Sequence, residues 1–520
     1  MRVTIGLGSQ RVRVGFALVT LELLAGCGTV TFSAPSGSAD GSVDGSPTRD
    51  ASRDQATGDA LRPPKDAARD GEIRLDAGLP HAEAGAPCDL AGLAIGCVAP
   101  DTGVFVAPSG TDSTPGGTQA SPFKTLGFAL KNLDMTKRIF ACAATFPETL
   151  NVATAYDGVA VRGGFACPGS PNPWTFTGTK TVLAPTTDPP LILQNLMIGA
   201  VFTDLELDGP NSPNPGGLSI AVYAQGAGPS HFTRCNLIGG TGGLGASMTG
   251  TSGSSPANGG KAPTGSSGAG SPTCTCVESI GGMGGNGGLL NTAPPAMNGS
   301  PGSPSEDGGA GGVVGATPCS GKQGLTGGSG PGGDGAAAPG TLSSGGWLPT
   351  TGHAGMQGGA GQGGGGGAGG TGVPLYGGCS GGCGGCGGAP GQGGQSGGSS
   401  FGLLSIGSAV ELDNCVVAGG TGGMGGAGGP GGDGQMPGAG GAPSATGACA
   451  GGGGGRGGSG GAGGGGAGGD SYGVASFGGV PQNLGMTSVY SAGMAGLGGD
   501  PGGAGATHGA SGQASPSVAF

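Results

Sequence analysis

Residues 219–243, SIAVYAQGAGPSHFTRCNLIGGTGG, and residues 400–423, SFGLLSIGSAVELDNCVVAGGTGG, decide the fold. Both segments begin with a serine and a short apolar run. Both end with a cysteine, a second apolar run and the glycines GGTGG. A third and weaker copy begins at Ser471 and ends near Gly496. A repeat of about 20 residues is the length of one solenoid coil, so the sequence predicts three stacked coils.

The glycine-rich tracts that separate these copies, residues 239–398 and 419–469, are predicted to be insertions. If the coils stack in register, both insertions leave and re-enter the stack at the same corner. Cys235 and Cys415 then lie on neighbouring strands. Such strands are about 4.8 Å apart, a distance that a disulfide spans, so this pair is a predicted disulfide.

Glycine dominates the composition, with 137 glycines in 520 residues and only 9% charged residues. The tracts often repeat in steps of three, a period that suits polyproline-II-like helices packed backbone to backbone. The alternative is a flexible linker without fixed structure, and the irregular first tract leaves both interpretations open. In composition the tracts resemble glycine-rich repeat proteins of the mycobacterial type.

A different pattern covers residues 103–133. Residues 103–106 are predicted to form a short strand, and two turns follow it. Ser121 is a predicted N-cap with Pro122 at the first helical position. Phe123 and three leucines then recur at helical spacing, which predicts an amphipathic helix that covers one end of the sheet structure.

The segment VFVAPSGTDSTPGGTQASPFKTLGFAL (104–130) resembles the entry of bacterial pectate-lyase-like β-helix proteins. FACAATFPETLNV and YDGVAVRGGFAC, which follow it, resemble the first rungs of that family. The resemblance covers residues 103–238 and implies an all-β, right-handed parallel β-helix with an N-terminal capping helix, here interrupted by long glycine-rich loops. Activity does not follow from this fold, which many functions share.

The N-terminus has the pattern of an exported lipoprotein. Basic residues precede an apolar run, and Leu24-Ala25-Gly26-Cys27 resembles a lipobox, which predicts a signal peptide over 1–26 and lipidation of Cys27. Gly28 favours the outer membrane, since aspartate there would resemble an inner-membrane retention signal. Residues 27–86 are predicted to be a disordered tether.

The remaining predicted boundaries are 87–238 for the first part of the β-helix, 239–398 and 419–469 for the insertions, 399–418 for a coil and 470–520 for the last coil with a glycine-rich tail.

Fourteen cysteines in an exported chain favour disulfides. Besides Cys235 with Cys415, the predicted pairs are Cys142 with Cys167, which bracket one coil, and Cys88 with Cys97. Cys379, Cys383 and Cys386 could bind zinc together with Cys274, Cys276 or Cys319. Disulfides are the favoured use, because no histidine is near in sequence. No metal and no cofactor is therefore predicted.

Asp204, Glu206 and Asp208 alternate with leucines, so they are predicted to share one face of a strand. They are either a calcium or catalytic row, with Arg234 nearby, or the solvent-facing side of a rung. We favour the second interpretation and assign no catalytic residue.

The predicted function is a non-enzymatic, lipid-anchored envelope scaffold. Its predicted partners are the membrane, through the lipid anchor, and envelope or extracellular polysaccharide. The alternative function is a polysaccharide lyase or hydrolase. The net charge of −11 excludes a basic nucleic-acid surface.

Overall fold

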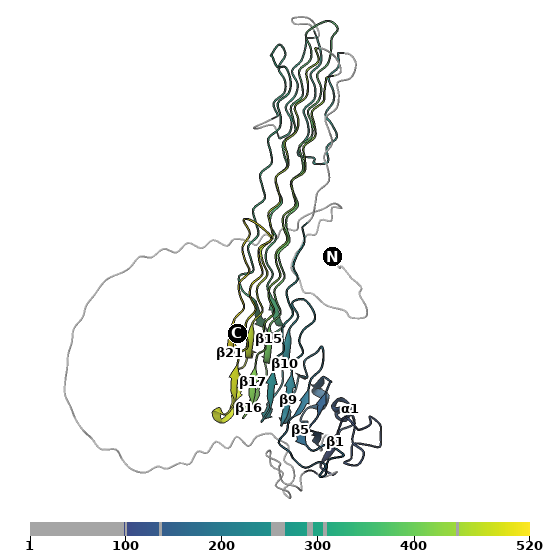
Figure 1. The fold of residues 1–520 in the computed structure, drawn as a ribbon, viewed down its shortest axis with the longest axis vertical. Coiled ribbons are helices and arrows are strands. Elements are labelled where there is room, and N and C mark those ends of the chain that lie inside the picture. The colour runs from purple at the N-terminus through teal and green to yellow at the C-terminus, as the bar shows by residue number, and fades with distance from the viewer. Residues whose placement is uncertain are drawn as a thin grey trace, which may run out of the picture. The chain divides into compact units, whose positions relative to one another are not determined.

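The computed structural model describes Val98 and residues 101–134, 138–250, 266–288, 295–304, 309–443 and 447–520. The regular elements in these ranges are nearly all β-strands, and parallel strands stack into three sheets (Figure 1). The predicted parallel β-helix is confirmed. None of the helices in these ranges has the length and apolarity needed to cross a membrane.

Each coil of the β-helix contributes strands to three parallel sheets, which we name A, B and C. Sheet A contains, in order, β1 (Gly103–Val106), β2 (Arg138–Cys142), β5 (Ala160–Phe165), β8 (Val201–Thr203), β11 (Ser230–Thr233), β16 (Val410–Asp413) and β19 (Gln482–Asn483). Sheet B contains β3 (Thr145–Phe146), β6 (Thr181–Leu183), β9 (Leu205–Asp208), β12 (Asn236–Ile238), β17 (Val416–Ala418) and β20 (Val489–Ser491). Sheet C contains β4 (Leu150–Ala153), β7 (Leu191–Gln194), β10 (Ser219–Gln225), β15 (Ser400–Ile406), β18 (Ser471–Phe477) and β21 (Ala514–Ala519).

The core of the β-helix is a set of side-chain stacks, one from each sheet. Alternation along each strand turns every second residue inward, and in-register pairing places like residues above one another. On sheet A, for example, Phe202 pairs with Phe232, and their rings stack at 5.0 Å between centroids. Leu412 continues this stack on the next coil and is fully buried. Short apolar runs are therefore enough to build a continuous core.

The N-terminal helix α1 (Leu126–Lys131) packs against the first coil, and Leu126, Ala129 and Leu130 join the core. It is shorter than predicted, and its N-cap is Thr125 instead of Ser121. Phe123 is not helical, because its backbone N–H and C=O pair with Phe105 and Ala107. The competing strand contact therefore delays the start of the helix.

The predicted stacking of the three serine-led coils is confirmed. Ser219 pairs with Ser400, and Ser400 pairs with Ser471, along sheet C. The chain leaves the β-helix after β12 and β17 in sheet B and re-enters it at β15 and β18 in sheet C. Both glycine-rich insertions thus occupy the same corner, as the sequence predicts.

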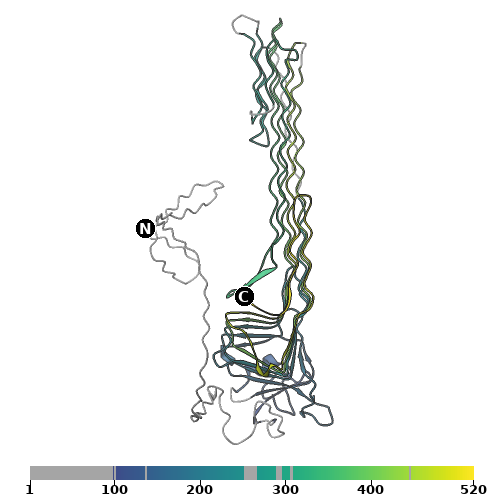
Figure 2. The same cartoon turned by 90° about the vertical axis from the view of Figure 1, so that its left-hand side faces the viewer.

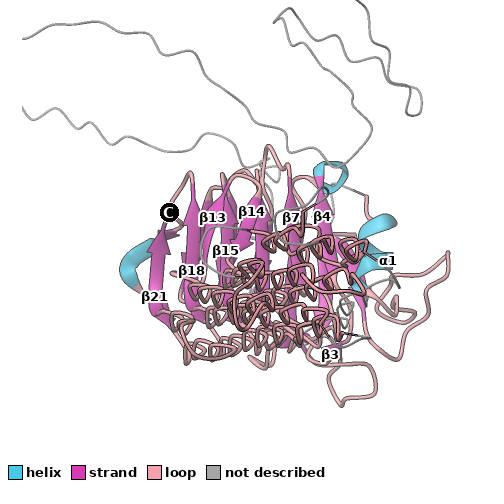
Figure 3. Cartoon of the chain, turned by 90° about the horizontal axis from the view of Figure 1, so that it is seen from above, coloured by secondary structure: helices cyan, strands magenta, loops and turns pink. Residues whose placement is uncertain are grey.

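The insertions form a bundle of extended chains (Figure 2). Hydrogen bonds between neighbouring chains recur at every third residue. In one antiparallel pair, Gly355, Gly358 and Gly361 donate to the carbonyl oxygens of Gly391, Gly388 and Gly385. In end-on view the chains are small coils packed side by side (Figure 3). This period is that of a polyproline II helix. The structure therefore agrees with the polyproline-II interpretation of the tracts and not with a flexible linker.

Glycine is required in the bundle because backbones approach one another too closely for a side chain. A Cβ atom placed on Gly366 would lie 1.9 Å from the carbonyl oxygen of Met283. Many other glycines in the bundle meet a neighbouring carbonyl at a similar distance. Small side chains such as those of Ala368 and Ala467 are buried between the chains, whereas larger ones such as those of Leu325 and Met356 are exposed on the outside of the bundle.

Two further elements were not predicted from the sequence. An antiparallel hairpin, β13 (Gly340–Ser343) and β14 (Gly346–Pro349), lies within the first insertion. Its Trp347 contacts the rings of Phe401 and Tyr472 on the outer face of sheet C. The glycine-rich tail ends in β21, which pairs with β18 as the edge strand of sheet C. Pro516 is compatible with β21 because an edge strand leaves one row of amides unpaired.

Candidate functional site

The turn between sheets A and B holds a ladder of residues with left-handed backbone. Asp204, Arg234 and Asn414 have φ of 57°, 53° and 51° and occupy equivalent positions on consecutive coils. Asparagine and aspartate tolerate this conformation, whereas arginine is unusual there. Unusual backbone geometry often marks functional positions, so this corner is the candidate site.

Arg234 is held by a two-pronged ion pair with Asp204. Its Nε lies 2.8 Å from Asp204 Oδ1, and its Nη2 lies 2.7 Å from Oδ2. The hydrogen bond to Asp204 raises the pKa of the Arg234 guanidinium. Lys180 donates to the carbonyl oxygen of Arg234. The fork geometry of the pair offsets the backbone strain and fixes the turn.

The structure corrects the predicted row of three carboxylates. Asp204 precedes β9 in a left-handed turn, so it does not share a strand face with Glu206 and Asp208. Glu206 Oε2 accepts a hydrogen bond from Asn236 Nδ2 at 2.8 Å. Burial, with a smaller effect from Glu206, raises the pKa of Asp208. The alternation of leucines and carboxylates does not reveal that the strand begins only after Asp204, because the turn is a single residue long.

The outer face of sheet A adds two more paired carboxylates. His231 Nδ1 lies 2.9 Å from Glu411 Oε2 on the next coil. Asp413 Oδ1 accepts a hydrogen bond from Thr487 at 3.1 Å. These contacts connect neighbouring coils in the way that cross-strand pairs stabilise a sheet.

The chemistry of this corner is limited by these contacts. Both oxygens of Asp204 are bound to Arg234, and its side chain is only 8% exposed. A carboxylate in that state is a poor base or nucleophile, because its charge is already compensated. Within the described ranges, no cluster of three or more histidine, cysteine, aspartate or glutamate residues could hold a metal ion. The corner is built to lock successive coils together.

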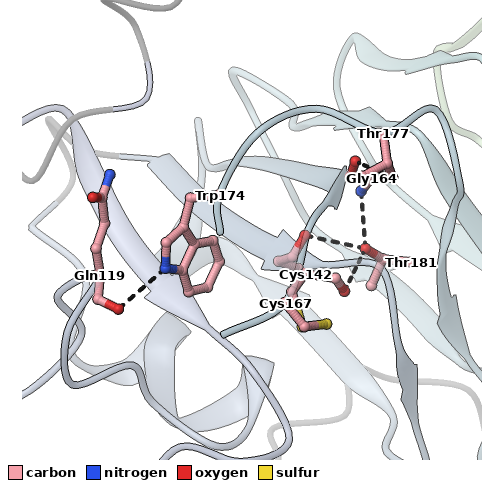
Figure 4. The surroundings of a disulfide bond; sticks show 8 residues. Gln119, Cys142, Gly164, Cys167, Trp174, Thr177 and Thr181 are labelled. Carbon is pink, nitrogen blue, oxygen red and sulfur yellow. Dashed lines mark hydrogen bonds between the residues drawn. A yellow bond between two sulfur atoms is a disulfide. The ribbon is translucent and has the colours of Figure 1, made fainter. Parts of the chain in front are cut away.

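The predicted Cys142–Cys167 disulfide is present, with 4.8 Å between the Cα atoms. It lies beside a small polar network in which Thr181 Oγ1 donates to the carbonyl oxygen of Cys142 (Figure 4). Trp174 Nε1 donates to the carbonyl oxygen of Gln119 at 3.1 Å and fixes the loop that follows Cys167. The bond therefore secures the first coils.

Three disulfides lie in the bundle, and they include most of the cysteines that the sequence considered as zinc ligands. The pairs are Cys274–Cys383, Cys276–Cys386 and Cys319–Cys449. Cys379, which the sequence grouped with the zinc candidates, is free and buried. Each bond connects chain segments more than 100 residues apart, where closure of a long loop gives the largest stabilisation.

The predicted Cys235–Cys415 disulfide is wrong in this structure, although the predicted register is right. Asn236 pairs with Val416, which places the two cysteines on neighbouring coils. Both thiols are free and buried, and the amide of Cys235 lies 3.4 Å from Cys415 Sγ. The Sγ of Cys415 also donates to a carbonyl oxygen of Phe232, which satisfies the thiol without a covalent bond. Cys27, Cys88 and Cys97 lie outside the described residues.

Sequence reasoning missed the role of the three repeated serines. Ser219 Oγ accepts from the N–H of Gly240, and Ser400 Oγ donates to the carbonyl oxygen of that same glycine. The pattern repeats one coil later, with Ser400 accepting from Gly420 and Ser471 donating to it. We name Ser219, Ser400 and Ser471 the serine relay. Their recurrence at the start of each repeat copy was the available signal.

The comparisons with known proteins add little to these contacts. No family model and no curated protein matches the chain. Among solved structures, the chain is similar to one described as "Rhamnogalacturonan lyase", with 15% identity and a TM-score of 0.20. The match covers 29% of this chain and 40% of the lyase chain, so it spans less than half of that protein.

Proposed function

We propose that this protein is a non-enzymatic, lipid-anchored component of a bacterial cell envelope that displays its glycine-rich bundle as a binding scaffold. The bundle carries the proposal. Its chains are bonded to one another at every third residue and tied by three disulfides. Such a framework holds outward side chains in fixed rows, as a recognition surface requires.

The sequence supports an anchor at one end of this scaffold. Lipid on Cys27 would attach the chain to the membrane, and residues 28–86 have the composition of a flexible spacer. Gly28 favours the outer membrane. Envelope or extracellular polysaccharide is the proposed environment of the bundle.

The charged groups support binding over catalysis. Glycosidases use two carboxylates that flank the scissile bond, and one of them must be free to attack or to activate water. Asp204, Glu206 and Glu411 instead contact Arg234, Asn236 and His231. The alternative function, a polysaccharide lyase or hydrolase, retains Asp208 beside Glu206 as its best candidate group.

Two measurements test the proposal. Metabolic palmitate labelling should be present in the wild type and absent in Cys27→Ala; equal labelling of both would contradict the anchor. A polysaccharide panel should show binding without turnover. Depolymerisation that Asp208→Asn abolishes, while folding is retained, would instead establish the enzyme.

A further inference from the structure

Three neighbouring chains carry an ordered array of exposed apolar side chains. The chains are residues 236–248, 416–430 and 489–500, which begin as β12, β17 and β20 of sheet B and continue into the bundle. We name the following residues the outer array: Ile238, Leu244, Val416, Met424, Val489, Met494 and Leu497.

The hydrogen-bonding register of sheet B continues from its strands into the bundle. It therefore aligns these side chains in rows across the three chains. Gly245 donates to the carbonyl oxygen of Met424, and Gly425 donates to that of Leu497. In the strands below, the same donor pattern accompanies direct residue pairing, as between Ile238 and Ala418. Leu244, Met424 and Leu497 therefore form one row across the three chains.

The outer array is strongly exposed for side chains of this type. Leu244, Met424, Met494 and Leu497 are 64%, 51%, 72% and 63% exposed, and Val489 is 61% exposed. Single exposed apolar residues are ordinary on protein surfaces, whereas a contiguous group on a rigid face marks an interaction site.

The free charges beside the outer array are mostly negative, because the nearby cations are already bound: Lys180 donates to the carbonyl oxygen of Arg234, and Arg234 pairs with Asp204. Glu206 and Asp208 on β9 pair with Asn236 and Ile238 at one edge. Asp500 lies at another margin, where its carbonyl oxygen accepts from Gly428 and its exposed carboxylate lies 3.4 Å from His508 Nδ1. The three chains contain no lysine or arginine, and the whole protein has a net charge of −11. The apolar surface thus has an acidic rim, formed by Glu206, Asp208 and Asp500.

We infer that the outer array binds a segment of another protein that presents an apolar stripe flanked by lysine or arginine. The apolar stripe covers the exposed leucine and methionine side chains, and the basic flanks meet the acidic rim. A second copy of this chain fits less well, because its own rim would bring carboxylates against carboxylates. The inference rests on the proposed function, because it names the kind of partner that the proposed binding scaffold would bind.

The direct test is titration of the purified chain with a fluorescent amphipathic peptide of leucine and lysine. Met424→Lys places a positive charge in the middle of the outer array and should weaken binding at least tenfold. Met356→Lys is the matched control, because Met356 is 64% exposed and lies on a different chain of the bundle. Its affinity should stay within twofold of the wild type, and circular dichroism checks that both variants fold.

Four outcomes would overturn the inference. They are failure of the wild type to bind the peptide, equal binding of a peptide with glutamate in place of lysine, equal weakening by both methionine substitutions, and dimerisation that Met424→Lys abolishes, which would assign the surface to a second copy. None of these results changes palmitate labelling at Cys27 or turnover of polysaccharide. Failure of this inference is therefore distinguishable from failure of the proposed function.

Discussion

The Oγ atom of Ser400 lies 2.7 Å from the carbonyl oxygen of Gly240, 160 residues earlier in the chain. The same Oγ accepts the N–H of Gly420 at 2.8 Å. One hydroxyl group thus connects the start of the first insertion to the start of the second. The serine relay is the joint between the β-helix and the bundle.

Ser400→Ala should destabilise the fold by about 1 to 2 kcal/mol, because it removes the hydroxyl partner of a part-buried carbonyl group and a part-buried amide. Chemical denaturation followed by circular dichroism measures the change. Ser329→Ala, on an exposed side chain of the bundle, is the control and should have little effect. Equal stability of both variants would contradict a structural role for the relay.

Gly366→Ala should disrupt the bundle, since the added Cβ would lie 1.9 Å from the carbonyl oxygen of Met283. A cost of about 2 kcal/mol or more is expected from such overpacking. Gly328→Ala is the matched control, because a Cβ there meets nothing within 4 Å. A thermal melt of each variant makes the comparison, and similar melting temperatures would argue against close backbone packing.

Asp470 makes stability depend on pH. Burial raises the pKa of its carboxyl group from 3.8 to about 6. The folded state therefore binds this proton more tightly than the unfolded state, so the contribution is complete below pH 4 and is lost as the pH rises through 6. Asp470→Asn should raise stability near pH 8, by on the order of 2 kcal/mol, and flatten the profile between pH 4 and 7.

The control for this effect is Asp433→Asn, which changes an exposed carboxylate. Denaturation of all three proteins at pH 4, 6 and 8 separates the contribution of Asp470 from the general effect of net charge. A pH profile of Asp470→Asn that follows the wild type would show that this carboxyl group is not responsible.

Arg234→Ala should destabilise the protein at pH 7, because it leaves the buried Asp204 carboxylate without its partner. A loss of about 2 to 3 kcal/mol is expected, at the low end for a buried pair since Arg234 is partly exposed. Chemical denaturation followed by circular dichroism measures the loss, and a stability equal to that of the wild type would contradict a structural role for the ion pair. Lys131→Ala, on an exposed side chain of α1, serves as control.

The thiols of Cys235, Cys379 and Cys415 should resist alkylation in the native protein. All three are buried, and burial raises the pKa of the Cys235 thiol, whereas the hydrogen bond with Cys235 lowers the pKa of the Cys415 thiol, so the protection of Cys415 comes from its burial. Only the thiolate reacts, so maleimide should label these residues in denaturant and not in buffer. Peptide mass spectrometry identifies the labelled sites, and rapid native labelling of Cys235 would contradict the tight stacking of its coil.

The β-helix was predictable because each coil repeats the same apolar alternation. Register followed from the shared serines and cysteines, and the common corner of the insertions followed from register. The bundle was not decidable from the sequence, because its hydrogen bonds join backbones and leave no mark in side-chain type beyond the three-residue period. Asp204 was misplaced for a related reason: a one-residue left-handed turn preserves the alternation of leucines while it ends the strand.

The candidate site was the least predictable part. The sequence grouped Arg234 with Asp204, which lies 30 residues earlier, but it did not show that the two side chains form an ion pair between successive coils. The disulfides of the bundle were also beyond a sequence argument, since the pairing of Cys319 with Cys449 depends on which glycine chains are neighbours. Such neighbours are set by the three-dimensional arrangement of the two insertions.

Those neighbours impose an order of assembly. Gly382, Gly385 and Gly388 in the first insertion donate to Gly452, Gly455 and Gly458 in the second. During synthesis, the first insertion therefore emerges without the chain against which it must pack, and it can reach its final hydrogen bonding only after residues 447–470 have been made. Contacts this distant in sequence slow folding. The hydrogen bonding of the bundle is consequently complete only when both insertions are present.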